Sequence, residues 1–448
     1  MLRHLLLAGV AMLIGVTQPA TAQDRPHWVT SWAASVHGPY PTGNPSAQPD
    51  LGFALPSPET GARDQTFRLT VRPTIWGPQA RIRLSNAFGT KPVTFEAVHA
   101  GLQMNSAALV PGTNRPVTFE GAARVTVEPG AMAWSDPVAL PFAQGEAADG
   151  LAGRKLAVSF RVVGASGPMT WHAKALNTSY LTAQGSDPDA AADADEVAFR
   201  FSTTSWFFLD AVDMAAPEDA FAVVAFGDSI TDGTNSTLNG EDRWPDVLAR
   251  RVHAAHGGRV AVVNAGIGGN QVVGPAEYGP DKPFPGGPSA EQRLDRDVLS
   301  LSGVGAVIWL EGTNDFSKNG NASAEAVKDG MSRTVGRIRE ALPGVRVIGA
   351  TVTPALGSTS AAHGHEEQDA KRKELNAFIA TSGLFDAVAD FAGATTDPST
   401  GELRAEMVPN STVGGEGDKL HPNRAGYLAM GNAVPLEALL PKDVAAGK

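Results

Sequence analysis

Residues 221–234 read FAVVAFGDSITDGT, in which an apolar run stops abruptly at glycine, aspartate and serine. Short, continuous apolar runs are typical of parallel strands that are buried on both faces. Three more runs of this kind follow along the chain: VAVVNA (260–265), AVIWLE (306–311) and VRVIGATV (345–352). The stretch therefore predicts the first strand of a parallel sheet, and it raises the question of why a serine stands at its end.

Amphipathic segments accompany these runs. Apolar residues recur at helical spacing in residues 242–256, 323–342 and 366–381. Strands that alternate with helices are typical of a doubly wound α/β sheet, in which ligands bind at the carboxyl ends of the strands. We therefore expect an α/β domain over residues 215–443, with its site formed where the first three apolar runs end and by a segment near the C-terminus.

The first half of the chain has a different pattern. Alternating or β-branched segments such as TFRLTVRP (66–73), ARIRLSNA (80–87) and KLAVSFRVV (155–163) are separated by clusters of Gly, Pro, Asn and Asp. Short strands with turns between them predict a β-sandwich or jelly-roll-like domain, here over residues 23–214. The polar segment AVDMAAPEDA (211–220) is expected to be the junction between the two domains.

The N-terminus has the pattern of a signal peptide. Arg3 precedes an apolar stretch, and Ala20-Thr21-Ala22 supplies the small residues of a cleavage site. We expect residues 1–22 to be removed by cleavage near Ala22 and the mature protein to be secreted or periplasmic. No apolar stretch is long enough to predict a membrane span, so stable membrane insertion is not expected.

Composition excludes several kinds of partner and site. The 448 residues carry a formal net charge of −11, which disfavours binding to nucleic acid or to anionic membranes. The chain has no cysteine, which removes thiol nucleophiles, zinc–thiolate sites and iron–sulfur clusters from consideration. The sequence leaves the oligomeric state open.

The residues at the predicted carboxyl edge suit acyl transfer. Ser229 follows the first apolar run, and Asp418 and His421 lie three residues apart in GDKLHPNRAGY (417–427). A histidine can accept the serine proton, and a carboxylate on the same turn can orient the imidazole ring. These three side chains therefore predict a serine nucleophile with its base and its orienting acid.

Hydrogen-bond donors follow the second and third runs. Gly268 and Gly269 allow backbone N–H groups to come close to a bound oxygen, and Asn314 offers a side-chain amide. The N–H groups of Ser229 and Gly269 and the Asn314 amide therefore predict a three-donor oxyanion hole, with Gly268 as the alternative to Gly269.

Four segments carry a specific resemblance. In chain order, GDSITDG, NAGIGGN, GTND and DKLH resemble the signature blocks of the SGNH, or GDSL, hydrolase superfamily. The resemblance implies a flavodoxin-like, three-layer parallel sheet, with Ser229, Asp418 and His421 as the catalytic triad. It also implies Gly269 and Asn314 as oxyanion donors. The choice of Gly269 over Gly268 stays open.

The front half resembles secreted bacterial members that carry a β-rich domain before the hydrolase domain. The segments that carry this similarity are WVTSWAAS (28–35), RIRLSNAFGTKPV (81–93) and TWHA (170–173). It implies no catalytic residue in the β-rich domain.

These observations predict a secreted serine esterase that needs no metal and no cofactor. O-acetyl groups on a polysaccharide or oligosaccharide are the first expectation for the substrate, because an exported chain with a β-rich domain suits extracellular polymers. The Gly/Pro-rich loop 271–289 is expected to wall the site and to favour a small acyl group. Two alternatives stay open: an esterase for lipid or lysophospholipid esters, and a carbohydrate-binding protein with an inert hydrolase-like domain.

Two other motifs lack the partners that their usual function requires. GDSxxD also occurs in haloacid-dehalogenase-type phosphatases, but the early aspartate nucleophile of that class is missing. The segment HGHEEQD, with His363 and His365, lacks the spacing of a zinc-protease motif and is interpreted as a solvated loop before a helix.

Overall fold

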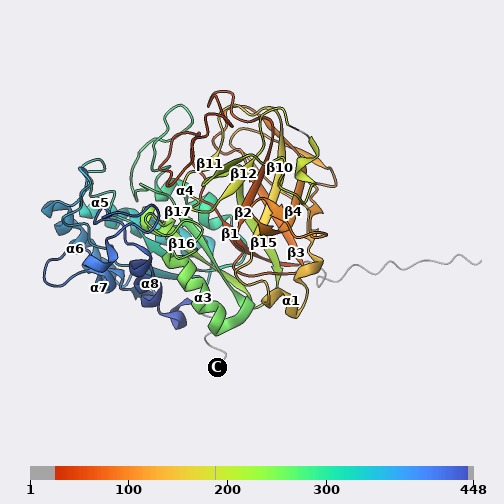
Figure 1. Ribbon diagram of the computed structural model, residues 1–448. Coiled ribbons are helices and arrows are strands. Elements are labelled where there is room, and N and C mark those ends of the chain that lie inside the picture. The colour runs from red at the N-terminus through yellow and green to blue at the C-terminus, as the bar shows by residue number, and fades with distance from the viewer. Residues whose placement is uncertain (1–25, 187, 442–448) are drawn as a thin grey trace, which may run out of the picture.

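The computed structural model describes residues 26–186 and 188–441, and the predicted signal peptide, residues 1–22, lies outside them. Figure 1 shows a β-rich region and a helix-covered sheet side by side. Among the described residues, no helix is long and apolar enough to cross a membrane.

The C-terminal half is built on a parallel sheet of five strands. In spatial order these are β17 (Val260–Gly266), β16 (Phe221–Gly227), β18 (Val304–Leu310), β19 (Arg346–Ala350) and β20 (Ala387–Ala389). In chain order this is 2-1-3-4-5, which is the flavodoxin-like order. The four strands predicted from apolar runs are confirmed, whereas the three-residue β20 was not predicted.

Helices cover both faces of this sheet. Because side chains alternate along a buried strand, Val224 and Phe226 of β16 join one apolar cluster while Val223 and Ala225 join the other. The helices of the first cluster are α4 (Ala290–Leu294), α5 (Ala324–Ala341) and α6 (Glu366–Thr381), and those of the second are α3 (Trp244–His256), α7 (Phe391–Thr395) and α8 (Arg424–Ala433). The three predicted helices, α3, α5 and α6, are confirmed.

The N-terminal half consists mainly of two antiparallel sheets. One contains β1 (His27–Ala33), β15 (Leu209–Ala216), β3 (Gln79–Ser85), β8 (Met132–Trp134) and β9 (Val138–Ala139). The other contains β13 (Phe201–Thr203), β12 (Ser179–Leu181), β2 (Arg63–Val71), β10 (Leu156–Ala165), β4 (Val93–Asn105), β5 (Ala108–Leu109), β6 (Arg115–Pro116) and β7 (Arg124–Val127). A short pair, β11 (Trp171–His172) and β14 (Trp206–Phe207), lies beside them.

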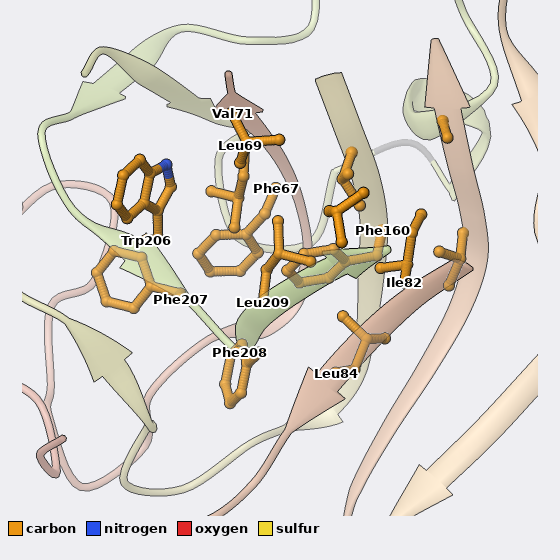
Figure 2. Close-up of a cluster of buried hydrophobic side chains, with 14 of the residues drawn as sticks. Phe67, Leu69, Val71, Ile82, Leu84, Phe160, Trp206, Phe207, Phe208 and Leu209 are labelled. Carbon is orange, nitrogen blue, oxygen red and sulfur yellow. The ribbon is translucent and has the colours of Figure 1, made fainter. Parts of the chain in front are cut away.

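The two antiparallel sheets share one hydrophobic core. Figure 2 shows Phe67 and Phe160 from one sheet facing Ile82 and Leu84 from the other, with Phe208 beside them. The rings of Phe67 and Phe160 are stacked with their centroids 5.5 Å apart. The antiparallel sheets around this core confirm a β-rich region, while the jelly-roll-like connectivity stays a prediction.

The expected junction at residues 211–220 is wrong in its first part. Strand β15 runs to Ala216 and lies between β1 and β3 in its sheet, so only residues 217–220 connect the two halves. The aspartates made this segment resemble a linker. In the structure Asp213 is buried and accepts a hydrogen bond from Arg81 at 2.8 Å, so its charge is paired inside the sheet.

The β-rich region is attached along the β17 edge of the parallel sheet. Strand β1 packs against β17 and β16. Hydrogen bonds reinforce this contact, from Thr30 N–H to the Ser302 carbonyl at 3.0 Å and from Val262 N–H to Thr74 Oγ1 at 3.0 Å. These hydrogen bonds lie toward the amino ends of the parallel strands, since Ser302 precedes β18 and Val262 is paired with Val223 near the start of β16.

Candidate active site

Ser229 stands where β16 ends. It is the first residue of α2 (Ser229–Asp232), a single helical turn whose N-cap is Asp228. The Asp228 carboxylate accepts a hydrogen bond from Ile230 N–H at 2.9 Å, which fixes the turn. Gly227 has to be glycine, because a Cβ there would collide with the Thr231 hydroxyl and the Leu310 carbonyl. The quoted stretch thus presents the serine hydroxyl at the edge of the sheet.

His421 and Asp418 meet this serine from the other end of the domain. Ser229 Oγ lies 2.8 Å from His421 Nε2, and His421 Nδ1 lies 2.6 Å from Asp418 Oδ2. With Nδ1 facing a carboxylate, the ring carries its proton there, which leaves Nε2 free to accept the serine proton. The structure therefore brings the three predicted side chains together in the order that nucleophilic catalysis requires.

Asp418 is held as a carboxylate. Its burial alone would raise the pKa, but hydrogen bonds from the His421 side chain and from the backbone N–H groups of His421 and Leu420 outweigh burial and lower the pKa of Asp418 below its ordinary value. An ionised Asp418 can both orient the imidazole and stabilise the imidazolium that forms when Ser229 gives up its proton.

Two backbone donors face the site without a protein partner. Across residues 26–186 and 188–441, neither the N–H of Ser229 nor that of Gly269 donates to a protein acceptor. Gly268 N–H, in contrast, donates to Asp232 Oδ2 at 2.9 Å. This geometry favours Gly269 over Gly268 as the oxyanion donor. The φ of +89° at Gly269 also explains why a glycine stands there.

Asn314 lies beside these donors. It lines the same pocket as Ser229 and Gly269, and one of its two amide N–H groups donates to the Asn270 carbonyl at 2.9 Å. That bond orients the amide, and the second N–H stays available for a ligand. All five predicted site residues therefore line one pocket, although their catalytic roles remain a proposal.

The segment TWHA, for which no catalytic role was expected, reaches the site from the β-rich region. His172 Nε2 lies 3.1 Å from Asp232 Oδ1, and both residues are buried. Since Asp232 Oδ2 accepts the Gly268 N–H, a continuous chain of hydrogen bonds runs from His172 to the glycine loop. The β-rich region thus supports the loop that carries Gly269.

A buried arginine, Arg293, forms hydrogen bonds to groups at the carboxyl ends of neighbouring strands of the parallel sheet. Arg293 donates to the Gly227 carbonyl at 2.8 Å, to Asn270 Oδ1 at 2.7 Å and to Glu311 Oε1 at 2.9 Å. Its charge is also paired with Asp297, at 3.1 Å. This role was not predicted, because the local sequence around Arg293 does not distinguish it from an arginine on an exposed helix face.

His363 is placed differently from the expectation. The interpretation of its segment as a solvated loop is wrong at this residue, because His363 lines the pocket and its Nδ1 lies 2.8 Å from Gln368 Nε2. Burial and the nearby His421 lower the pKa of His363 to about 4, so it stays neutral at neutral pH. Its position after the fourth strand was the signal that could have placed it at the site.

The walls of the pocket also differ from the expectation. None of the lining residues comes from loop 271–289, which the structure describes in full. The β-rich region forms that wall instead, because its early loop lies against the glycine block: Asn44 Nδ2 donates to the Gly268 carbonyl at 2.7 Å. The complete lining is Gly43, Asn44, Pro45, Ser46, Lys174, Ser229, Thr234, Gly268, Gly269, Asn314, Ser360, His363, Asp418, Leu420 and His421.

Within the described part of the chain, no group of three or more His, Asp or Glu side chains is arranged to hold a metal ion.

Part of the C-terminal half is similar in sequence to a known family. The sequence profile of the GDSL-like Lipase/Acylhydrolase family matches residues 225–429, which include Ser229 and His421. No curated protein sequence matches the chain.

Solved structures resemble about half of the chain. A carbohydrate acetylesterase from Sinorhizobium meliloti is 18% identical and is matched over 99% of its length by 50% of this chain, with a TM-score of 0.36. A lipase/acylhydrolase from Enterococcus faecalis is 22% identical over 92% of its length and 48% of this chain, with a TM-score of 0.36. The aryl esterase of M. smegmatis is 19% identical over 96% of its length and 48% of this chain, with a TM-score of 0.36.

Proposed function

We propose that this chain, a carboxylic ester hydrolase whose residues 225–429 belong to the GDSL-like lipase/acylhydrolase family, is a serine esterase that works through Ser229, His421 and Asp418. The observation that carries the proposal is the hydrogen-bonded line from Ser229 Oγ through the imidazole to Asp418, at 2.8 and 2.6 Å. The same pocket holds donors that suit an oxyanion.

In the first half-reaction, Ser229 Oγ attacks the ester carbonyl carbon while His421 Nε2 takes the hydroxyl proton. The carbonyl oxygen becomes an oxyanion, which accepts hydrogen bonds from the N–H groups of Ser229 and Gly269 and from the Asn314 amide. When the tetrahedral intermediate collapses, the bond to the alcohol oxygen breaks. His421 gives its proton to the departing alcohol, and the acyl group stays on Ser229.

In the second half-reaction, a water molecule repeats the sequence. His421 removes a proton from the water as it attacks the acyl carbon, the same three donors hold the second oxyanion, and the bond to Ser229 Oγ breaks as His421 returns the proton. The free acid leaves. Every proton transfer passes through His421, and the residues named here need no metal or cofactor.

For the substrate, we propose short acyl groups, above all O-acetyl groups, on a saccharide. The lining of the pocket supports this choice, because Pro45 and Leu420 are its only aliphatic side chains larger than a methyl group. Asn44, Ser46 and Ser360 instead offer hydrogen bonds of the kind that sugar hydroxyls use. A long acyl chain would gain little from such a wall.

Lipid esters are the runner-up, and chain length separates the two. We expect kcat/KM to be at least about a hundredfold higher on p-nitrophenyl acetate than on p-nitrophenyl palmitate, since each additional methylene would lie against a polar wall. Equal rates would favour the lipid substrate. Acetate released from a panel of acetylated polysaccharides would then identify the polymer.

A carbohydrate-binding protein with an inert hydrolase-like domain is the remaining alternative. A fluorophosphonate probe labels only an activated serine, so we expect it to modify Ser229 in the native protein and to leave heat-unfolded protein unmodified. Failure to label Ser229 in folded protein would favour the inert domain. We also propose secretion after cleavage near Ala22, with residues 23–214 as the β-rich domain and 215–443 as the hydrolase domain.

A further inference from the structure

Lys174 brings a positive charge from the β-rich region into the pocket of Ser229. It follows β11 by two residues and is only 4% exposed, yet it lines the same cavity as Ser229 and His421. Its ammonium group donates to Thr234 Oγ1 at 2.6 Å. Thr234 belongs to the segment that follows the nucleophile, so the charge lies next to the reacting part of the pocket.

The charge of Lys174 has no direct counterion. In the described residues no carboxylate lies within 4.0 Å of its nitrogen, and Thr234 is the one acceptor for its three N–H donors. Burial lowers the pKa of Lys174, and the more distant charges of Asp232 and Asp418 oppose that effect. Both of these carboxylates already accept other hydrogen bonds. Asp232 accepts from His172 and Gly268. Asp418 accepts from His421 and Leu420.

The buried arginines of the described residues all have carboxylate or carbonyl partners, which sets Lys174 apart. Arg83 lies 2.7 Å from Asp210, Arg372 lies 2.6 Å from Asp369, and Arg293 is paired with two carboxylates. Arg68 has no carboxylate, but four backbone carbonyls and a serine hydroxyl accept all of its hydrogen bonds. A buried cation that keeps free donors in an open pocket is suited to an anionic ligand.

We propose that Lys174 binds a carboxylate of the substrate, so that the preferred substrate is an O-acetylated acidic saccharide, one that carries a uronate near the acetyl ester. This inference rests on the proposed esterase function and names its substrate class. A carboxylate fits better than a phosphate, because one ammonium group matches one negative charge and Asp418 would repel a second. The polar side chains Asn44 and Ser46 remain for the sugar hydroxyls.

The test uses two methyl glycosides that are acetylated at the same hydroxyl: a glucuronoside with a carboxylate at carbon 6, and a glucoside with a hydroxymethyl group there. Acetate release gives kcat/KM for each, and the ratio is the acid preference. We expect wild type to prefer the glucuronoside by at least about tenfold, the effect of one charge-assisted hydrogen bond. In Lys174→Met, a substitution of similar length, the ratio should fall to about one.

The matched control is Lys373→Met on α6, where the lysine side chain is 65% exposed. This variant should keep the wild-type ratio. An unchanged ratio in Lys174→Met, or a wild-type ratio near one, would overturn the inference while acetate release from both sugars still supported the esterase function. Release from neither sugar, by protein whose Ser229 reacts with fluorophosphonate, would instead overturn the saccharide substrate itself.

Inhibition provides a measurement on unaltered protein in case Lys174→Met does not fold. Methyl glucuronoside without the acetyl group should compete with p-nitrophenyl acetate at a Ki at least about tenfold below that of methyl glucoside. Equal inhibition constants for the two sugars would contradict a carboxylate site at Lys174.

Discussion

At the scale of single residues, Asn314 has two hydrogen-bonding tasks. One amide N–H of Asn314 donates to the Asn270 carbonyl, and we propose that the other donates to the oxyanion. We expect Asn314→Ala to lower kcat on p-nitrophenyl acetate by about 10²–10³, as measured for other oxyanion-hole amides, with a much smaller change in KM. Wild-type kcat in a folded variant would show that Asn314 does not contact the oxyanion.

The lowered pKa of Asp418 predicts a pH-dependent contribution to stability. A carboxyl whose pKa is lowered by folding stabilises the fold above its ordinary pKa, about 3.9, and this contribution disappears as the pH falls below that value. Asp418→Asn cannot ionise. The difference in melting temperature between wild type and Asp418→Asn should therefore be largest near pH 7 and should narrow as the pH falls from about 4 to about 2.

Asp219→Asn is the control for this titration, because Asp219 is 54% exposed and pairs only with Arg259, at 3.4 Å. Its difference in melting temperature from wild type should be small throughout. If the difference in melting temperature between wild type and Asp418→Asn stayed constant down to pH 2, Asp418 would not have a lowered pKa in the folded protein.

At the scale of elements, the link between β11 and the glycine loop is testable through His172. Its imidazole orients Asp232, which holds Gly268 next to the proposed donor Gly269. We expect His172→Leu to lower kcat by about tenfold with KM nearly unchanged, because the oxyanion donor is displaced and ground-state binding is not. His172→Gln, which can still donate to Asp232, should recover part of that loss.

A loss in KM alone for His172→Leu would contradict this positioning role. His99→Leu on β4 controls for the removal of a partly buried histidine elsewhere in the β-rich region, whose ring hydrogen-bonds to the Ala97 carbonyl at 2.9 Å. It should keep the wild-type kcat.

Arg293 on α4 predicts a large effect on stability. Replacing it by leucine would leave Glu311 buried without its cation, which typically costs about 3–5 kcal/mol, while Asp297 would keep its pair with Arg296. Arg333→Leu on α5 is the control, because Arg333 is 58% exposed and its pair with Glu291 should contribute about 0–1 kcal/mol. Urea unfolding measures both. Similar losses in the two variants would contradict a central role for Arg293.

The elements also show what could be predicted from sequence. Runs such as FAVVAF mark buried strands, so β16 to β19 were found. In contrast, β20 has only three residues, too few for a run. Strand β15 contains Asp213, which suggested a linker because its partner Arg81 is not visible in the local sequence. The pattern of a strand is local, whereas the neutralisation of a buried charge depends on residues more than a hundred positions away.

Some residues of the site could also be predicted from the local sequence, and others could not. Ser229, Asp418 and His421 stand in short blocks whose chemistry is visible in the sequence, and the structure brings them together. Lys174 and Asn44 have no such marks, because they reach the pocket only through the packing of the β-rich region against the parallel sheet. The wall assigned to loop 271–289 was wrong for this reason.

At the scale of the whole molecule, contacts between the β-rich region and the parallel-sheet half hold the two together. Apolar contacts of Val29 with Ala222 and Ala261, and the hydrogen bonds of Thr30, join them independently of the exposed connection at residues 217–219. We expect a protein with a protease site inserted after Glu218 to stay associated and active after cleavage. Separation of the two fragments during gel filtration, or loss of esterase activity on cutting, would contradict this expectation.

The central claim is that Ser229 is the nucleophile of an esterase. Its most direct test compares wild type with Ser229→Ala on p-nitrophenyl acetate, with the melting temperature measured on the same preparations. The oxygen removed contacts His421 and is not part of the hydrophobic core, so the melting temperature should change little. The catalysed rate should fall by at least about 10³. Retained activity in folded Ser229→Ala would contradict the assignment.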